Sequence, residues 1–173
     1  MSPQSIHPDF KLNGQGFTNA EALLKYVKDC CPLHYDFLKS WFDTSPTIIA
    51  HTSGSTGLPK AIELSKKAMI YSAQNTIDFF KLSPRTSALL NLSSTFIAGK
   101  MMWVRALAGG WHLDVRSPDN ESIKQALLQK KYDFGAMVPL QVYKNLNFIE
   151  KVHKLIIGGG VVSDNLKAQL WSL

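Results

Sequence analysis

"HTSGSTGLPK" (residues 51–60) is a polar, glycine-containing segment between two stretches typical of β-strands, "PTIIAHT" before it and "KAIEL" after it. Short β-branched and apolar runs bounded by glycine favour strands. We therefore expect a buried strand at about residues 47–52, then a loop, then a returning strand at 60–64.

The loop has the composition of a phosphate-binding segment. Its glycines allow the backbone to approach a ligand closely, its hydroxyls can donate to anionic oxygens, and its last residue carries a full positive charge. It contains no acidic residue. These features fall on Thr52, Ser53, Gly54, Ser55, Thr56, Gly57 and Lys60. We expect the loop to hold a chain of phosphates.

Three common loop motifs do not fit this segment. The P-loop of nucleotide hydrolases has glycine before its lysine and a serine or threonine after it, whereas Lys60 stands between Pro59 and Ala61. The dinucleotide-binding pattern needs a third spaced glycine. A nucleophile elbow needs a serine with glycine two residues away on both sides, and neither Ser53 nor Ser55 meets that condition.

The segment resembles the signature of the adenylate-forming superfamily, which includes acyl-CoA synthetases, firefly luciferase and the adenylation domains of peptide synthetases. In that family a loop rich in serine, threonine and glycine, ending in Pro-Lys, wraps the β- and γ-phosphates of ATP. Residues 52–57, Pro59 and Lys60 match, and Ala61 departs from the usual glycine. The resemblance implies ATP with Mg2+ as substrate, coenzyme A as co-substrate, and a small carboxylic acid as the group that is activated.

Two later stretches resemble the same family. "ELSKKAM" (residues 63–69) is similar to the strand-to-helix transition that follows the family's loop. "KLIIGGGVVSDNLKAQL" (residues 154–170) is similar to a strand ending in glycines that border the acyl and adenine pockets, which implies this role for Gly158, Gly159 and Gly160. Three glycines after a strand alone usually mark a turn; their distance from the loop favours the pocket.

The stretch "NLSSTFIAGKMMWVRAL" (residues 91–107) bears on the acid. Phe96 stands at the family's usual histidine position, and Gly99 followed six residues later by Arg105 resembles the o-succinylbenzoate–CoA ligases of menaquinone synthesis. Their substrate is an aromatic dicarboxylate, and its second carboxylate needs a cation to offset its desolvation. We assign Phe96, Gly99, Arg105 and, less strongly, Lys100 to the acyl site. The alternative for both cations is a place on the exposed face of an amphipathic helix.

Composition excludes several classes. A chain of 173 residues with 45% hydrophobic content supports a folded core, and its +6 charge comes from scattered lysines, which predicts no nucleic-acid site. The adjacent Cys30 and Cys31 and the five dispersed histidines lack ligand spacing, so we expect no metal-binding residue and a reducing, cytoplasmic location. No stretch is typical of secretion or of a bilayer span. A homodimer is left open.

Alternating strand and helix patterns predict an α/β fold, a layered domain with a mainly parallel sheet flanked by helices. The resemblance implies the first part of the large domain of an adenylate-forming enzyme. Residues 1–46 are expected to form a helical lead-in, and residues 47–173 part of the ATP-binding domain. The sequence ends in "AQLWSL", and the family's later motifs and small carboxy-terminal domain have no counterpart. We expect a fragment that does not complete the reaction alone.

The expected elements follow from periodicity and capping residues. Helices are predicted at 18–30 with a Thr18/Glu21 capping box, 33–42, 65–80 capped by Ser65, 99–110, 117–131 capped by Ser117, 139–146, and 163–173 capped by Ser163. Strands beyond the loop are predicted at 86–92, 111–116, 133–138 and 152–157.

Three functions stay open from the sequence. The first is an o-succinylbenzoate–CoA ligase. The second is another acyl-CoA synthetase or an amino-acid adenylation domain, which would share the loop and differ in the acyl pocket. The third is a non-catalytic nucleotide-binding module. Reaction of the complete gene product with different acids separates the first two, and the reading frame after residue 173 tests the third.

Overall fold

The computed structural model describes residues 5–52 and 60–172. It contains a six-stranded sheet in the order β2-β1-β6-β5-β7-β8, in which every neighbouring pair is parallel except β1 with β2. The strands are β1 Lys11–Leu12, β2 Gln15–Gly16, β5 Ser87–Leu90, β6 His112–Val115, β7 Tyr132–Met137 and β8 Val152–Ile157. The predicted layered α/β fold with a mainly parallel sheet is confirmed.

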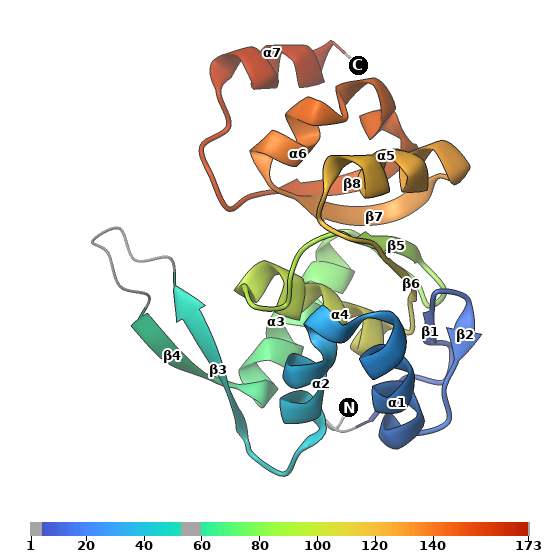
Figure 1. Cartoon of the computed structure of the whole chain (residues 1–173). Helices are drawn as coiled ribbons and strands as arrows, with labels where there is room; N and C mark the ends of the chain where they lie inside the picture. The colour runs from blue at the N-terminus through green and yellow to red at the C-terminus, as the bar shows by residue number, and fades with distance from the viewer. Residues whose placement is uncertain (1–4, 53–59, 173) are drawn as a thin grey trace.

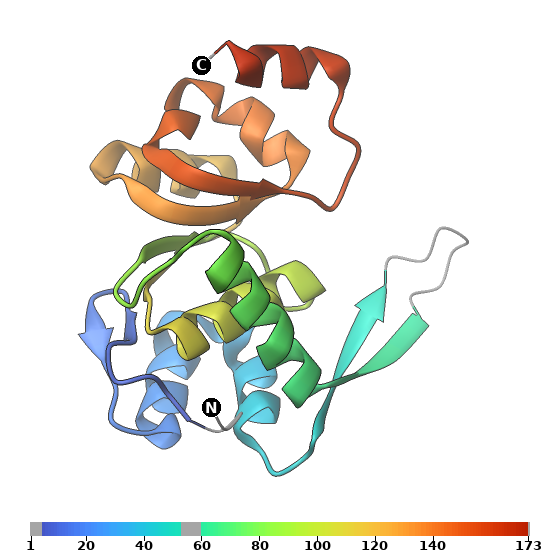
Figure 2. The same ribbon diagram turned by 180° about the vertical axis from the view of Figure 1, so that it is seen from behind.

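Helices cover both faces of this sheet (Figures 1 and 2). One layer contains α1 Ala20–Cys30, η1 Pro32–His34, α2 Tyr35–Phe42, α3 Lys66–Phe79 and α4 Ile97–Gly109. The other contains α5 Asn120–Gln129, α6 Pro139–Lys144, η2 Leu146–Lys151 and α7 Asp164–Trp171. None of the helices in the described parts of the chain is long and apolar enough to cross a bilayer.

The central strand β5 contributes side chains to both hydrophobic cores. Ala88 and Leu90 belong to the cluster under α3 and α4, whereas Leu89 belongs to the cluster under α5 and α6. All three are 0% exposed. Successive side chains of a strand point to opposite faces, and burial on both faces explains why residues 88–90 of β5 are apolar without interruption.

Helix α4 lies in the middle of its layer and is buried nearly all round. Its apolar residues therefore show no single stripe, which is typical of a helix enclosed by other elements. It ends at Gly110, whose φ of 68° is left-handed. Glycine takes this conformation without the Cβ clash of other residues, and the predicted glycine stop is confirmed.

Strands β3 (Thr47–Thr52) and β4 (Lys60–Ser65) form a separate antiparallel sheet, a two-stranded hairpin that extends away from the body (Figure 1). A strand on each side of the loop segment was predicted and is confirmed. The expectation that the first strand is buried was wrong, because Ile49 is 56% exposed while Ile48 and Ala50 are buried. A strand with one partner, packed on one side, leaves its other face to solvent.

The first 46 residues contain more than the helices that the sequence suggested. Strands β1 and β2 form a short hairpin, and β1 pairs with β6. The turn between them is Asn13–Gly14, with φ of 48° and 86°. Asn-Gly is a strong signal for a hairpin turn. The strands on either side contain only two residues each, too few for an alternating hydrophobic pattern to be recognised.

Two predicted helix caps were wrong. The side chain of Asn19, not Thr18, accepts from the backbone N–H of Ala22 at the start of α1. At α5 the side chain of Asp119, not Ser117, accepts from Ser122. In both cases the observed cap, an Asn or an Asp, stands one or two positions after the predicted Thr or Ser, and both residue types are strongly preferred at this position. The Ser65 and Ser163 caps are confirmed.

Candidate functional site

The topology creates a crevice at the carboxyl ends of the strands of the main sheet. The chain passes from β5 to β6 through α4 on one face, then crosses through α5 to β7 on the other side of β5. Consecutive connections thus run in opposite directions from β5. In open α/β sheets such a reversal separates the loops at the carboxyl ends of the strands and leaves a ligand-binding crevice there.

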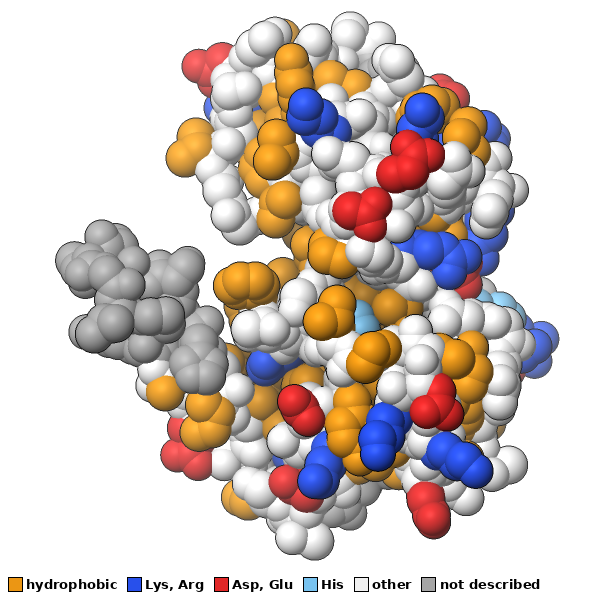
Figure 3. Space-filling view, viewed as in Figure 1, with side chains coloured by type: hydrophobic (Ala, Val, Ile, Leu, Met, Phe, Trp, Pro, Cys, Tyr) orange, Lys and Arg blue, Asp and Glu red, His pale blue; other side chains and the backbone are white. Residues whose placement is uncertain are grey.

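A cavity of about 590 Å³ occupies this place. Its walls come from the ends of β5, β7 and β8, from the start of α4, and from the hairpin β3–β4. They include Ala50, Leu64, Leu92, Phe96, Val138 and Gly158. Figure 3 shows this side of the molecule hollowed, with hydrophobic side chains at the rim. Its size and mainly apolar lining suit the body of a small organic molecule.

The hairpin connects the cavity with the loop segment. Ala50 of β3 and Ile62 and Leu64 of β4 line the cavity, and the backbones of Thr52 and Lys60 pair at the far end of the two strands. Ser53, Gly54, Ser55, Thr56 and Gly57 lie outside the described residues, as do the side chains of Thr52 and Lys60. Their assignment to ATP phosphates stays a prediction.

The glycines after β8 divide between two hollows. Gly158 and Gly159 line the cavity, and Gly159 and Gly160 line an adjoining, more open hollow beside α6 and α7. Gly159 has a φ of 77°, which favours glycine, and a Cβ there would lie 3.3 Å from a methyl carbon of Val138. A role for these glycines beside acyl and adenine groups stays a prediction.

Phe96 and Gly99 occupy the start of α4. Phe96 is the residue before the first turn, lines the cavity and is 58% exposed. Gly99 is buried, and a Cβ on it would lie 2.2 Å from the carbonyl oxygen of Ser93. A side chain at this position would displace the segment that leads from β5 into α4. Gly99 therefore shapes the cavity indirectly, by allowing Ser93, which lines it, to lie close to α4.

The two predicted cations do not belong to the described lining of the cavity. Lys100 is buried, its Nζ donates to the carbonyls of Ser94 and Thr95, and it lies 5.4 Å from the ring centroid of Phe37. Arg105 is half-buried. Its buried Nε has no hydrogen-bond partner within the described residues, and desolvation lowers the pKa of Arg105. Contact of either side chain with substrate stays a prediction.

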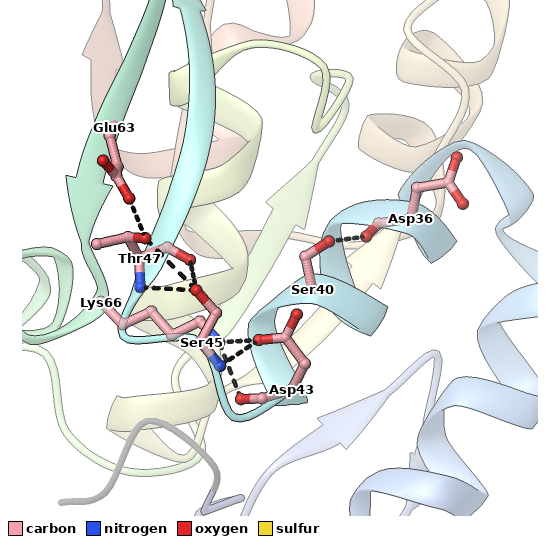
Figure 4. A network of polar contacts seen from close by, with 7 residues as sticks. All are labelled: Asp36, Ser40, Asp43, Ser45, Thr47, Glu63 and Lys66. Atoms are coloured by element: carbon pink, nitrogen blue, oxygen red, sulfur yellow. Dashed lines mark hydrogen bonds and ion pairs between the residues drawn. The ribbon is translucent and has the colours of Figure 1, made fainter.

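A polar network that sequence reasoning missed fastens the base of the hairpin (Figure 4). Lys66, which follows β4, is 1% exposed; its Nζ lies 2.7 Å from Oδ1 of Asp43 and 3.0 Å from the Asp43 carbonyl oxygen. The backbone N–H of Lys66 donates to Pro46. The ammonium lowers the pKa of Asp43 through its hydrogen bond. The end of α2 is thereby joined to the start of α3, on either side of the hairpin.

A second missed network joins the carboxyl ends of β5 and β7. The side-chain amide of Asn91 donates to Oε1 of Gln141 at 3.1 Å, and Gln141 donates to the carbonyls of Asn91 and Pro118. Oε1 of Gln141 also accepts from the backbone N–H of Val138, which lines the cavity. A polar residue directly after an apolar strand was the available signal for Asn91.

Among the described residues, no cluster of three or more His, Cys, Asp or Glu side chains is arranged to hold a metal ion. The expected absence of a resident metal ligand stays a prediction.

Comparison with known proteins assigns the chain to a family. The model of the AMP-binding enzyme family matches residues 27–172, so the chain belongs to the AMP-binding enzymes. These are the adenylate-forming enzymes that the loop segment resembles, and the predicted family is confirmed.

Individual relatives agree with the family. The chain is 30% identical over 120 residues to 2-succinylbenzoate–CoA ligase of Salmonella typhimurium, covering 68% of this chain and 26% of the relative. It is 29% identical over 130 residues to indoleacetate–CoA ligase of Aromatoleum aromaticum, covering 74% and 25%. The chain therefore spans about a quarter of the length of these two curated relatives.

A solved structure matches more of the chain. The AMP-forming acyl-CoA synthetase/AMP-acid ligase II-like protein of Dyadobacter fermentans superimposes with a TM-score of 0.76 at 32% identity. The match covers 92% of this chain and 47% of that protein. The fold of this chain is therefore shared with about half of that protein.

Removing the ammonium at the hairpin base is expected to loosen the hairpin. In Lys66→Met the two contacts with Asp43 are lost, and stability should fall by about 1–3 kcal/mol. Amide hydrogen exchange should rise in residues 47–52 and 60–65 and stay unchanged in β5 and β7. Lys67→Met is the matched control, because Lys67 is the next residue and is exposed. Equal exchange in the two variants would contradict the role of Lys66.

His34 is expected to make stability depend on pH. It is 4% exposed, lies edge-on to Trp103, and burial lowers its pKa to about 4. An unfolded histidine titrates near 6.5, so between these values the unfolded chain binds more protons and acid favours it. Stability should therefore fall by roughly 2–3 kcal/mol from pH 7 to pH 4.5 through this residue.

Urea unfolding at the two pH values checks this expectation. His34→Phe should remove this part of the pH dependence, whereas His153→Gln, at an exposed position, should keep it. The same pH dependence in His34→Phe as in the unaltered chain would show that His34 is not the source.

Proposed function

We propose that this chain is the phosphate-loop-bearing part of an ATP-dependent acid–CoA ligase. The observation that carries the proposal is the joining of two features by one hairpin. The side of β3–β4 lines an apolar cavity at the carboxyl ends of β5, β7 and β8, and its far end bears the segment of residues 52–60. A carboxylic acid in the cavity would have its reactive end within the same region as ATP phosphates held by the loop.

The chemistry explains why both parts are needed. A carboxylate is a poor electrophile because its leaving group would be oxide. Its oxygen attacks the α-phosphate of ATP, forming an acyl–AMP anhydride and releasing pyrophosphate. The coenzyme A thiolate then attacks the acyl carbon, forming the thioester and expelling AMP. Each step exchanges one bond for another, and no oxidant or reductant is required.

The chain's own residues would act mainly by binding and orientation. The hydroxyls and backbone N–H groups of residues 52–57 would hold the β- and γ-phosphates, and Lys60 would offset negative charge without acting as a base. Magnesium bound to ATP would spread the charge of the departing pyrophosphate. Phe96, Gly158 and Gly159 would contact the acid, because they line the cavity. Use of ATP and coenzyme A supports a cytoplasmic location.

We propose o-succinylbenzoate as the acid. Two observations support this choice: the likeness to 2-succinylbenzoate–CoA ligase, and a half-buried Arg105 whose Nε lacks a partner among the described residues. Its guanidinium is the better candidate for the second carboxylate, since the donors of Lys100 already face carbonyl groups. The likeness to indoleacetate–CoA ligase favours an aromatic acid as the alternative. An amino-acid adenylation domain and a non-catalytic nucleotide-binding module are further alternatives.

The function is tested by acid-dependent exchange of labelled pyrophosphate into ATP. The complete gene product should catalyse exchange with o-succinylbenzoate and much less with indoleacetate, fatty acids or amino acids. Preference for another acid would refute o-succinylbenzoate as the substrate and assign the protein to the ligases of that other acid. Binding of ATP without exchange for any acid would favour the non-catalytic module. Residues 1–173 alone are expected to bind ATP weakly and to form no acyl-CoA.

Replacement of Arg105 tests the choice of acid. Arg105→Ala should raise the KM for o-succinylbenzoate about ten- to a hundredfold, the cost of losing a charge-assisted hydrogen bond, and change the KM for ATP little. Arg85→Ala is the control, because Arg85 is an exposed arginine in the turn before β5, outside α4. Equal increases for both substrates in Arg105→Ala would refute the assignment.

A further inference from the structure

The segment from Ser93 to Phe96 connects β5 to α4 and forms one wall of the cavity. Ser93 and Phe96 line the cavity directly, and Ser94 between them is 2% exposed. The segment is neither helix nor strand. Its position therefore depends on contacts that its residues make with the elements behind it.

Two such contacts involve different elements. Gly99 lets the first turn of α4 approach the Ser93 carbonyl so closely that a Cβ would lie 2.2 Å from the oxygen. The hydroxyl of Ser94 donates to the carbonyl of Leu33 in η1, at 3.1 Å. The wall of the cavity thus contacts both α4 and η1, two elements of the same helical layer.

Lys100 makes the third contact. Its Nζ donates to the carbonyl of Ser94 and, at 3.3 Å, to that of Thr95, and it lies over the ring of Phe37 at 5.4 Å. An ammonium has three donors and no acceptor. Two carbonyls and an aromatic face therefore occupy the directions in which Lys100 can interact.

The burial of this charge strengthens the attachment. Lys100 is 6% exposed, forms no ion pair with any described residue, and has a pKa lowered by desolvation. A buried ammonium is costly unless its hydrogen bonds are made. Movement of Ser94 and Thr95 away from Nζ would leave both the charge and the carbonyls unpaired, so the segment is held more firmly than by neutral contacts.

We propose that Lys100 is a positioning residue, which fixes the Ser93–Phe96 wall from behind and thereby sets which acids the cavity accepts. The attachment of the wall stands on the contacts of Lys100 alone. The effect on acid choice rests on the proposed function. In this role Lys100 acts through Phe96 and does not touch the substrate.

Amide hydrogen exchange of residues 1–173 tests the attachment. In Lys100→Met the side chain keeps its apolar contact with Phe37 and loses its donors, so exchange of residues 93–97 should rise by about tenfold or more. Exchange in β7 and β8 should not change. Lys124→Met is the control, because Lys124 is an exposed helical lysine on the far face of the sheet. Unchanged exchange at residues 93–97 would overturn the proposal.

Ser94→Ala provides an independent variant if Lys100→Met does not fold. It removes only the hydrogen bond to Leu33 and should raise exchange in the same residues by a smaller factor. A rise spread evenly over the domain in Ser94→Ala would show that the wall is not a separately held unit, and would likewise overturn the proposal.

The effect on acid choice is measured with the complete gene product by pyrophosphate exchange. Lys100→Met should reduce the ratio of kcat/KM for o-succinylbenzoate to kcat/KM for indoleacetate about tenfold and leave the KM for ATP unchanged. Faster amide hydrogen exchange at residues 93–97 with an unchanged preference among acids would refute the specificity role. If the unaltered protein catalyses no pyrophosphate exchange with any acid, the proposed function is refuted. The hydrogen-exchange experiment would still decide the attachment.

Discussion

Strand β5 pairs in parallel with β6 on one side and β7 on the other, and the rest of the domain is arranged around this double pairing. Its alternating side chains enter the cores on both faces, so each face must be covered by its own helices. The chain can reach both neighbours of β5 only by crossing first over one face and then over the other. The crevice at the carboxyl ends follows from this route, whatever residues line it.

Buried cations have different partners in different parts of the molecule. Lys66 is paired with a carboxylate, Lys100 with two carbonyls and an aromatic ring, and Nε of Arg105 with no described hydrogen-bond acceptor. A buried charge whose contacts are complete stabilises one local arrangement of the backbone. The half-buried guanidinium of Arg105 instead keeps a donor without a described acceptor, which is the property that the proposed contact with a carboxylate requires.

Much of the fold was predictable because its signals are local. Strand β5 is an apolar run, and Ser65, Ser163 and Gly110 mark helix ends by their own backbone and side-chain chemistry. The loop segment could be assigned to a family because its residue types follow one another in an uninterrupted row. The Asn13–Gly14 turn is an equally local signal, because Asn-Gly alone favours a tight hairpin turn.

The missed features depend on residues that are distant in sequence. Lys66 meets Asp43 across the whole hairpin, and Gln141 meets Asn91 across four intervening elements, α4, β6, α5 and β7. The exposure of Ile49 follows from the packing of β3 on one face only, which no local pattern reveals. Lys100 was recognised as important for its charge, but only its folded surroundings show carbonyl groups at its ammonium. The residue types alone indicated which side chains are charged or polar, whereas their hydrogen-bond partners depend on how distant segments pack together.

The hairpin β3–β4 also has a mechanical consequence. Each of its strands contains six residues, a length of about 20 Å, and the pair is fastened to the body near one end. A rotation of about 10° at the base of such a hairpin moves its far end by about 3.5 Å, which exceeds the tolerance of a reacting geometry. Angular stiffness at Asp43 and Lys66 therefore governs the spatial precision of groups carried far from both.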